Sequence, residues 1–252
     1  MSEFLQKYLK AREEKNSTLC IGLDPAMPGL RKENIMPDDD IMGFCLDIID
    51  KTAPHACAFK ANSQYILFNL NMEQLQELNQ KIHGSGSISI LDHKLSDIGS
   101  SNLAAIHSAK KAGFDAITFS PFAGNIKEAV NQCHSNGLGI FVLTLMSNPE
   151  ARIQKEFSRS GENLYEWIAA EAKDADGLVV GLTENATSKE IQKIREIAGK
   201  DKILLCPGLG AQGGSTDKLP AGNSLVNVGR DIIYSKDPVK KASEFSQQLK
   251  LR

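Results

Sequence analysis

Short apolar runs alternate along the chain with longer stretches in which apolar residues recur every three or four positions. The short runs are mostly apolar, and several are rich in Ile, Val, Leu or Phe. This composition is typical of strands buried on both faces of a parallel sheet. The predicted strands span residues 19–24, 56–61, 87–92, 116–120, 139–145, 177–181, 202–206 and 224–228.

The stretches between these runs have the period of amphipathic helices. They span residues 39–51, 72–83, 96–112, 126–135, 161–173, 188–198 and 238–249. An additional helix over residues 3–14 precedes the first strand, with Phe4, Leu5, Tyr8 and Leu9 on one face. The regular alternation of strand and helix indicates parallel βα units.

Two architectures fit this alternation: an open doubly wound sheet and a closed (β/α)8 barrel. The chain has 252 residues, and a barrel of this type reaches that length as a single domain. The eight predicted strands also favour the barrel. No linker or low-complexity segment divides the sequence, so we expect one α/β domain over residues 1–252, a TIM barrel with an extra N-terminal helix.

The longest connection follows the fifth predicted strand and includes the polar residues 147–161. Polar connections at a barrel mouth serve either as mobile lids or as plain surface loops. The sequence leaves both interpretations open.

Charged and polar residues recur where the predicted strands end, which is the face that carries function in (β/α)8 barrels. Ionised groups rarely lie beside buried strands unless they are paired. The residues concerned are Asp24, Lys60, Asp92, Lys94, Asp97, Ser147 and Arg230.

Asp92 and Lys94 are two positions apart, so a regular strand points both side chains the same way and His93 the other. Lys60 and Asp24 end neighbouring strands, which predicts an alternating array of lysines and carboxylates. Opposite neighbours keep the lysines charged, and a charged lysine can protonate a developing carbanion. A purely structural ion-pair network is the alternative, although four charges at one face favour function.

A glycine-rich segment follows the seventh predicted strand, with Gly208, Gly210, Gly213 and Gly214 in the run 207–214. Gly229 and Arg230 follow the eighth. Loops after these two strands commonly bind phosphate in barrels, through backbone N–H groups and a bidentate arginine. The glycines alone would also suit a flexible loop, and the segment matches neither a Walker A nor a GxGxxG motif.

Composition and charge narrow the function. Hydrophobic residues make up 41% and charged residues 24% of the chain, and the net charge is −2, so a disordered or nucleic-acid-binding protein is not expected. No apolar run is long enough for a membrane span, and the N-terminus does not resemble a signal peptide. The five scattered cysteines suggest buried thiols in a reducing compartment, and we expect a cytoplasmic protein.

No cofactor or metal is expected either. The histidines lack zinc-ligand spacing, and lysines among the carboxylates would compete with Mg²⁺. The glycine-rich segment with Arg230 favours a small molecule that carries a phosphate as the partner.

These motifs resemble the orotidine 5′-monophosphate decarboxylase family, in its longer bacterial-type branch. Residues 92–98 read DHKLSDI and match the DxKxxDI signature of the family. The segments 22–25, 59–60, 146–149, 207–214 and 228–230 resemble its other motifs, so the similarity covers almost the whole chain.

The resemblance implies a cofactor-independent decarboxylation of orotidine 5′-monophosphate to uridine 5′-monophosphate in pyrimidine biosynthesis. Lys94 would protonate the pyrimidine carbon, Asp92 would lie near the substrate carboxylate, and Asp97 would reach the site of the partner in a homodimer. The implied substrate-binding residues are Asp24 and Lys60 at the ribose, Ser101 at the ribose, Ser147 at the pyrimidine, and Gln212, Gly229 and Arg230 at the phosphate.

Two alternatives remain at this stage. Keto-sugar-phosphate decarboxylases and hexulose-phosphate synthases resemble this scaffold but use magnesium and a glutamate where this chain has Lys60. A non-catalytic phosphate-binding barrel would be expected to lack one of the four charges Lys60, Asp92, Lys94 and Asp97, and all four are present.

Overall fold

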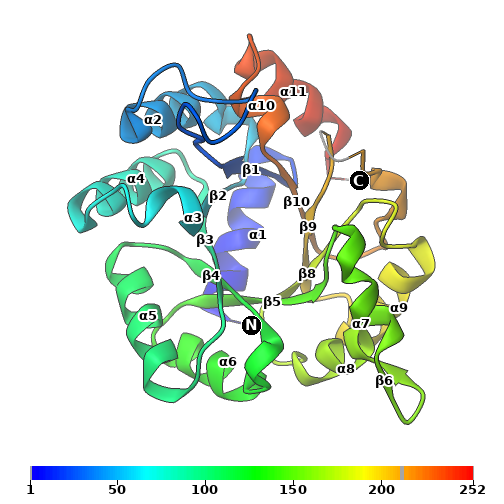
Figure 1. The fold of residues 1–252 in the computed structure, drawn as a ribbon. Helices are drawn as coiled ribbons and strands as arrows, with labels where there is room; N and C mark the ends of the chain where they lie inside the picture. The colour runs from blue at the N-terminus through cyan, green and yellow to red at the C-terminus, as the bar shows by residue number, and fades with distance from the viewer. Residues whose placement is uncertain (1, 211–212, 252) are drawn as a thin grey trace.

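The computed structural model describes residues 2–210 and 213–251. Eight parallel strands close into a barrel in the order β1-β10-β9-β8-β5-β4-β3-β2, and helices surround it (Figure 1). The predicted closed barrel is therefore confirmed. Its strands are β1 (Leu19–Leu23), β2 (Ala58–Asn62), β3 (Ile88–Leu95), β4 (Ala116–Phe119), β5 (Gly139–Leu145), β8 (Gly177–Val180), β9 (Ile203–Pro207) and β10 (Ser224–Val228).

The longer helices occupy the predicted stretches with small differences at their ends. They are α1 (Glu3–Lys15), α2 (Ile41–Thr52), α4 (Met72–Gly84), α5 (Gly99–Lys111), α6 (Ile126–Ser135), α8 (Leu164–Glu171), α9 (Ser188–Ala198) and α11 (Pro238–Gln248). Capping boxes begin three of them, at Asn71, Asn163 and Thr187. In each box a polar side chain and the Gln or Glu three residues later satisfy backbone N–H groups that the first turn leaves free.

Short elements that the sequence pattern does not predict lie mainly in the connections. Four-residue helices follow two strands directly, α3 (Ser63–Ile66) after β2 and α10 (Arg230–Ile233) after β10. The polar connection after β5 contains the 3₁₀ turn η3 (Pro149–Arg152), α7 (Ile153–Glu156) and a small hairpin of β6 (Ser158–Arg159) and β7 (Glu162–Asn163). Further 3₁₀ turns are η1 (Ala53–His55), η2 (Pro121–Ala123) and η4 (Thr216–Lys218).

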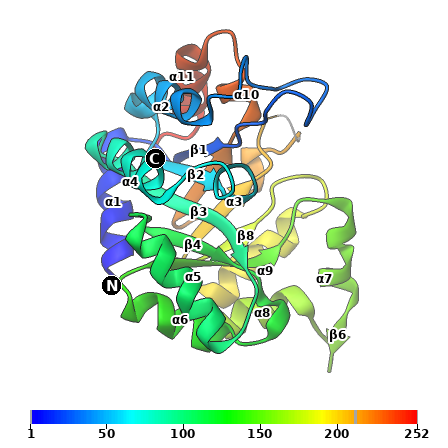
Figure 2. The ribbon, with the colours of Figure 1, turned by 60° about the vertical axis from the view of Figure 1, so that its left-hand side comes forward.

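Helix α1 packs against the amino ends of the strands, on the side of the barrel away from α7 and β6 (Figure 2). Phe4 and Tyr8 are buried there, and Phe4 meets Phe141 edge to face at 5.6 Å between ring centres. The Phe4 ring lies where a side chain at Gly139 would project, so glycine permits the close approach. The extra helix therefore closes the bottom of the barrel, a role that its apolar face already suggests.

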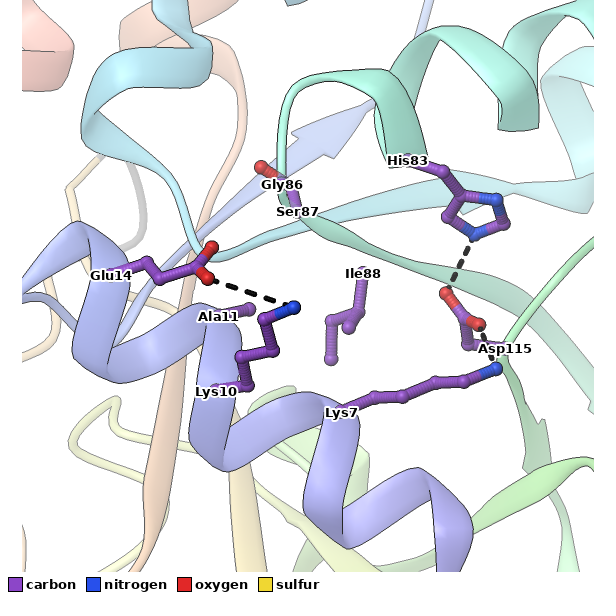
Figure 3. A pocket seen from close by; sticks show the side chains of 9 residues that line it. All are labelled: Lys7, Lys10, Ala11, Glu14, His83, Gly86, Ser87, Ile88 and Asp115. Carbon is purple, nitrogen blue, oxygen red and sulfur yellow. Dashed lines mark hydrogen bonds and ion pairs between the residues drawn. The ribbon is translucent and has the colours of Figure 1, made fainter.

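Ion pairs hold α1 against the barrel. Lys7 lies 3.2 Å from the carboxylate of Asp115, and His83 lies 2.8 Å from the same carboxylate (Figure 3). Asp115 is 5% exposed and also accepts a hydrogen bond from the Ser89 backbone N–H. One buried carboxylate thus joins α1, α4 and the start of β3.

The five cysteines are all buried and unbonded to one another, as the sequence suggests. Across residues 2–210 and 213–251, the helices are too short or too polar to cross a membrane.

Candidate active site

The ends of β2 and β3 bring two lysines to one aspartate. Lys60 Nζ lies 2.6 Å from Asp92 Oδ2, and Lys94 Nζ lies 2.7 Å from Asp92 Oδ1. The pairing of β2 with β3 aligns Lys60 with Ile90, two residues before Asp92. The register therefore places the lysine beside the carboxylate without any unusual loop.

The opposite charges in this cluster shift the pKa values of Lys60 and Asp92 so that both groups stay ionised. Burial by itself lowers the pKa of Lys60, but the negative charges of Asp92 and Asp24 outweigh it and raise the pKa above its usual value. Burial likewise favours a higher pKa for Asp92, but Lys60 and Lys94 hold that pKa well below its usual range. Lys60 and Asp92 are therefore charged at neutral pH, which is the state that an electrostatic catalyst requires.

Thr118 on β4 completes the surroundings of Asp92. Its hydroxyl donates a hydrogen bond of 3.0 Å to Asp92 Oδ1 and accepts one of 2.9 Å from the backbone N–H of Lys94. Thr118 could not be predicted from the sequence, because a single threonine in a short buried strand has no distinguishing pattern.

A cavity of about 110 Å³ lies directly over the three charges. Apolar side chains of Leu143, Val179 and Leu205 form part of its wall, and Met146 and Ser147 also line it. A small, mostly apolar space next to fixed charges strengthens their field on any bound group. The site can therefore stabilise a negative charge that develops on a bound ring and can supply a proton from Lys94.

A second hollow has a volume of about 40 Å³. Pro207 at the end of β9 lines the first cavity, and the next residue, Gly208, lines this second one. Within the described part of the chain, the Arg230 guanidinium makes no hydrogen bond or ion pair. The lining residues are Asp24, Gly208, Leu209, Asn227, Gly229, Arg230 and Asp231. The hollow thus combines an available arginine with backbone from two glycine positions, the arrangement that the sequence predicts for an anion.

The glycine loop beside this hollow needs its glycines. Gly208 and Gly210 have φ angles of 110° and 82°, which side-chain-bearing residues rarely adopt. A side chain at Gly210 would also collide with the carboxylate of Asp231. Gln212, which the resemblance places at the phosphate, lies outside the described residues.

The segment after β1 is fixed by Tyr234, the residue that follows α10. The Tyr234 hydroxyl donates to the Asp24 carbonyl at 2.8 Å and accepts from the Ala26 N–H at 2.7 Å. Within residues 2–210 and 213–251, the buried Oδ1 of Asp24 has no hydrogen-bond partner. This carboxylate therefore keeps an acceptor available beside both Lys60 and the second hollow.

The fifth strand end is also fixed in place. The Ser147 carbonyl accepts hydrogen bonds from Thr183 Oγ1 at 2.6 Å and from Asn185 Nδ2 at 2.8 Å. These contacts fix the backbone at Ser147. Among the described residues, the Ser147 hydroxyl itself makes no hydrogen bond. His93, expected to point away, is not among the residues that line the cavity.

Two of the expected site residues do not join the cluster within one chain. Asp97 is exposed and accepts a hydrogen bond from the Ile98 N–H, and its own N–H and carbonyl are bonded to the side chain of Asn102. Ser101 is exposed on α5. No ion pair joins Asp97 to a lysine among the described residues. The array that the sequence predicts therefore consists here of Lys60, Asp92 and Lys94 with Asp24 nearby.

The sequence over residues 17–245 matches the model of the "Orotidine 5′-phosphate decarboxylase / HUMPS family". The chain belongs to this family. An orotidine 5′-phosphate decarboxylase of Ralstonia pickettii is 35% identical over 251 residues, which cover 92% of this chain and 90% of that protein.

Solved structures of the family share the fold. A Toxoplasma gondii protein described as an orotidine-monophosphate decarboxylase superposes with a TM-score of 0.84 and 26% identity, covering 97% of this chain and 94% of that one. The Leishmania donovani OMP decarboxylase gives a TM-score of 0.80 and 25% identity, covering 99% and 97%. The barrel and the resemblance of its motifs to this family are thus confirmed.

Proposed function

We propose that this family member decarboxylates orotidine 5′-monophosphate to uridine 5′-monophosphate, a step of pyrimidine nucleotide biosynthesis. The observation that carries the proposal is the ionic cluster at the barrel mouth, in which Asp92 bridges Lys60 and Lys94 beneath a small cavity. The full-length similarity to proteins named orotidine 5′-phosphate decarboxylase supports the same activity.

The reaction breaks the bond between C6 of the pyrimidine and the carboxylate carbon. Carbon dioxide leaves, the electron pair stays on C6, and Lys94 transfers a proton from its ammonium to that carbon. Fixed charges stabilise the developing carbanion because they need no reorganisation during the step. Solvent then returns a proton to the neutral Lys94 amine.

The two hollows suit the two ends of such a substrate. We assign the pyrimidine and its carboxylate to the cavity over Asp92 and Lys94, with Ser147 at the ring edge. Arg230 and Gly229, with Gln212, would hold the phosphate, and Asp24, Lys60 and Ser101 would bind the ribose. Binding of a phosphate far from the reacting carbon supplies free energy that the transition state can use.

The family description also names HUMPS proteins. A keto-sugar phosphate, the substrate class of the alternative that the sequence left open, is the second candidate. Lys60 argues against it, because a magnesium enzyme of this scaffold is expected to have a glutamate at this strand end. The described residues contain no group of three or more His, Cys, Asp or Glu side chains placed to bind a metal ion.

We also propose a homodimer in which Asp97 acts in the site of the partner subunit. Asp97 is exposed, and among the described residues its carboxylate accepts a hydrogen bond from the Ile98 N–H and makes no ion pair with Lys60 or Lys94. Large apolar side chains are exposed next to it in the chain and in the connections after β2 and β4, the two strands that pair with β3, with Phe68 92%, Ile98 63% and Phe122 94% exposed. Large exposed apolar side chains at one end of a barrel are typical of an interface.

The buried free thiols support the expectation of a reducing, cytoplasmic location. The barrel takes its elements from the whole length of the chain, which supports treating residues 1–252 as one domain.

A spectrophotometric assay with orotidine 5′-monophosphate, with and without EDTA, tests the activity and its independence of metal. We expect loss of orotidine absorbance with release of carbon dioxide, at the same rate in both samples. Activity that EDTA removes and Mg²⁺ restores would favour the keto-sugar-phosphate candidate, and inactivity towards the nucleotide would refute the proposal.

A further inference from the structure

The backbone of Lys94 has a conformation that lysine rarely adopts. Its φ angle is 53°, in the left-handed region. The other non-glycine residues with positive φ in the described structure are Asn16, Asn34 and Ser160, and all three lie outside strands. Lys94 lies within β3, where its conformation coincides with a shift in the pairing with β4 between Leu91 and Leu95.

A residue keeps such a conformation only where its surroundings hold it. The backbone of Lys94 is restrained by the hydroxyl of Thr118, which accepts a hydrogen bond from the Lys94 N–H at 2.9 Å. The register shift takes this N–H out of the regular ladder, and the hydroxyl supplies the partner. Thr118 is 1% exposed, so water cannot readily replace it.

The same hydroxyl also fixes the carboxylate that Lys94 contacts. It donates its hydrogen to Asp92 Oδ1 at 3.0 Å, and Lys94 Nζ lies 2.7 Å from that oxygen. The Thr118 hydroxyl therefore restrains Lys94 in two ways. It accepts a hydrogen bond from the Lys94 backbone, and it fixes the Asp92 carboxylate that contacts the Lys94 ammonium.

We propose that Thr118 is a positioning residue, whose hydroxyl holds Lys94 in its left-handed conformation and aims its ammonium into the cavity. The inference rests on the proposed function, because it concerns the proton donor of that reaction. Loss of the hydroxyl leaves a buried N–H unpaired and allows β3 to return towards an extended conformation. A displacement of about 1 Å at a reacting group can reduce a rate by about 10²-fold.

Substitutions that differ by the hydroxyl alone test this role. Thr118→Val preserves the branched shape and removes both hydrogen bonds, whereas Thr118→Ser keeps the hydroxyl. We expect Thr118→Val to lower kcat by about 10²-fold with a much smaller change in KM. Thr118→Ser should restore most of the activity, and Thr118→Ala should behave like Thr118→Val.

Thr144→Val is the matched control. Thr144 is fully buried on β5, and within the described part of the chain its hydroxyl donates only to the Val142 carbonyl of its own strand, at 3.0 Å. The control makes the same change in the same barrel wall without touching Asp92 or Lys94. Its kcat should stay close to that of the wild type, even if its melting temperature falls.

Hydrogen exchange at the Lys94 amide gives a readout that does not depend on turnover. In the substrate-free wild type and in Thr118→Ser, the Lys94 amide should be protected from exchange. In Thr118→Val and Thr118→Ala it should exchange much faster, while the exchange of neighbouring β4 amides stays unchanged. Equal kcat in Thr118→Ser and Thr118→Ala, or equal protection of Lys94 in both, would overturn the inference. A wild type that does not consume orotidine 5′-monophosphate would refute the proposed function instead, and the exchange result would still test the restraint.

Discussion

Asp92 uses each of its two oxygens for a different lysine, so the two cations have distinct surroundings. Lys60 is almost fully buried, with 7% of its side chain exposed, whereas 40% of the Lys94 side chain is exposed. The buried lysine keeps Asp92 ionised, and the more exposed lysine can reach a substrate. This difference in burial is the structural reason for assigning the proton to Lys94.

Lys94→Ala should abolish turnover and leave the fold intact. The substitution removes the proton donor, while Lys60 still neutralises Asp92. A positioned acid and charge typically contribute at least about 10²–10⁴-fold to a rate. Circular dichroism and the orotidine assay would measure fold and activity, with Lys127→Ala, at an exposed side chain of α6, as the control. Activity within tenfold of the wild type would contradict the assignment.

Arg230→Ala should weaken the binding of uridine 5′-monophosphate more than it affects stability. Hydrogen bonds to charged groups contribute about 1.5–3 kcal/mol each, and alanine offers none. Arg230→Lys keeps the charge but loses the two-donor geometry, so its affinity should lie between that of the wild type and that of Arg230→Ala. Titration calorimetry would measure this order, and an unchanged affinity in Arg230→Ala would place the phosphate elsewhere.

At the level of elements, two aspartates at the bottom of the barrel have matching roles. Asp115 precedes β4 and binds His83, and Asp176 precedes β8 and binds His134 at 3.0 Å. Each also contacts α1, through Lys7 in one case and Ser2 in the other. The helix that closes the barrel is thus attached near its start and in its second turn.

The attachment at Asp115 predicts a loss of stability in acid. Burial by itself raises the pKa of Asp115, but hydrogen bonds from His83 and the Ser89 N–H, with the charges of His83 and Lys7, lower it below its usual value. A carboxylate whose pKa is lower in the folded state stabilises the protein above its unfolded pKa of about 3.9. This contribution disappears as the pH falls through the folded pKa.

Asp115→Asn should therefore be less stable than the wild type at pH 7, by about 1–3 kcal/mol, and the difference should shrink below about pH 4. Urea unfolding at several pH values would measure both effects. Asp174→Asn, at an exposed position, is the matched control and should follow the wild type. A constant difference between Asp115→Asn and the wild type across this range would argue against the attachment.

At the level of the whole molecule, the proposed shared site predicts recovery of activity between inactive variants. Lys94→Ala and Asp97→Ala proteins should each be nearly inactive. After subunit exchange, about half of the dimers are mixed and each has one intact site, so about a quarter of wild-type activity should return under two-fold symmetry. Mass labelling would verify the exchange. No recovery after verified exchange would show that Asp97 serves its own chain.

Much of the fold follows from local sequence patterns. Strands β5 and β10 and helices α6 and α9 have the predicted ends, because burial on both faces and helical periodicity both leave regular traces in sequence. The approach of Lys60 to Asp92 was also predictable, since parallel strands present their carboxyl ends on one face. The four-residue helices α3 and α10 were not, because one turn is too short to show a period.

The sequence by itself determined the barrel, the closing helix and the set of charged residues at the strand ends. Only the tertiary structure decided that Lys94 departs from a regular strand, that Thr118 restrains it and that Asp97 stays apart from the cluster of its own chain. The reason is physical: alternation along a strand is a local property, whereas the Thr118 contacts join residues 24 and 26 positions apart. Such contacts exist only once β3 and β4 have paired in the shifted register that the closed barrel contains.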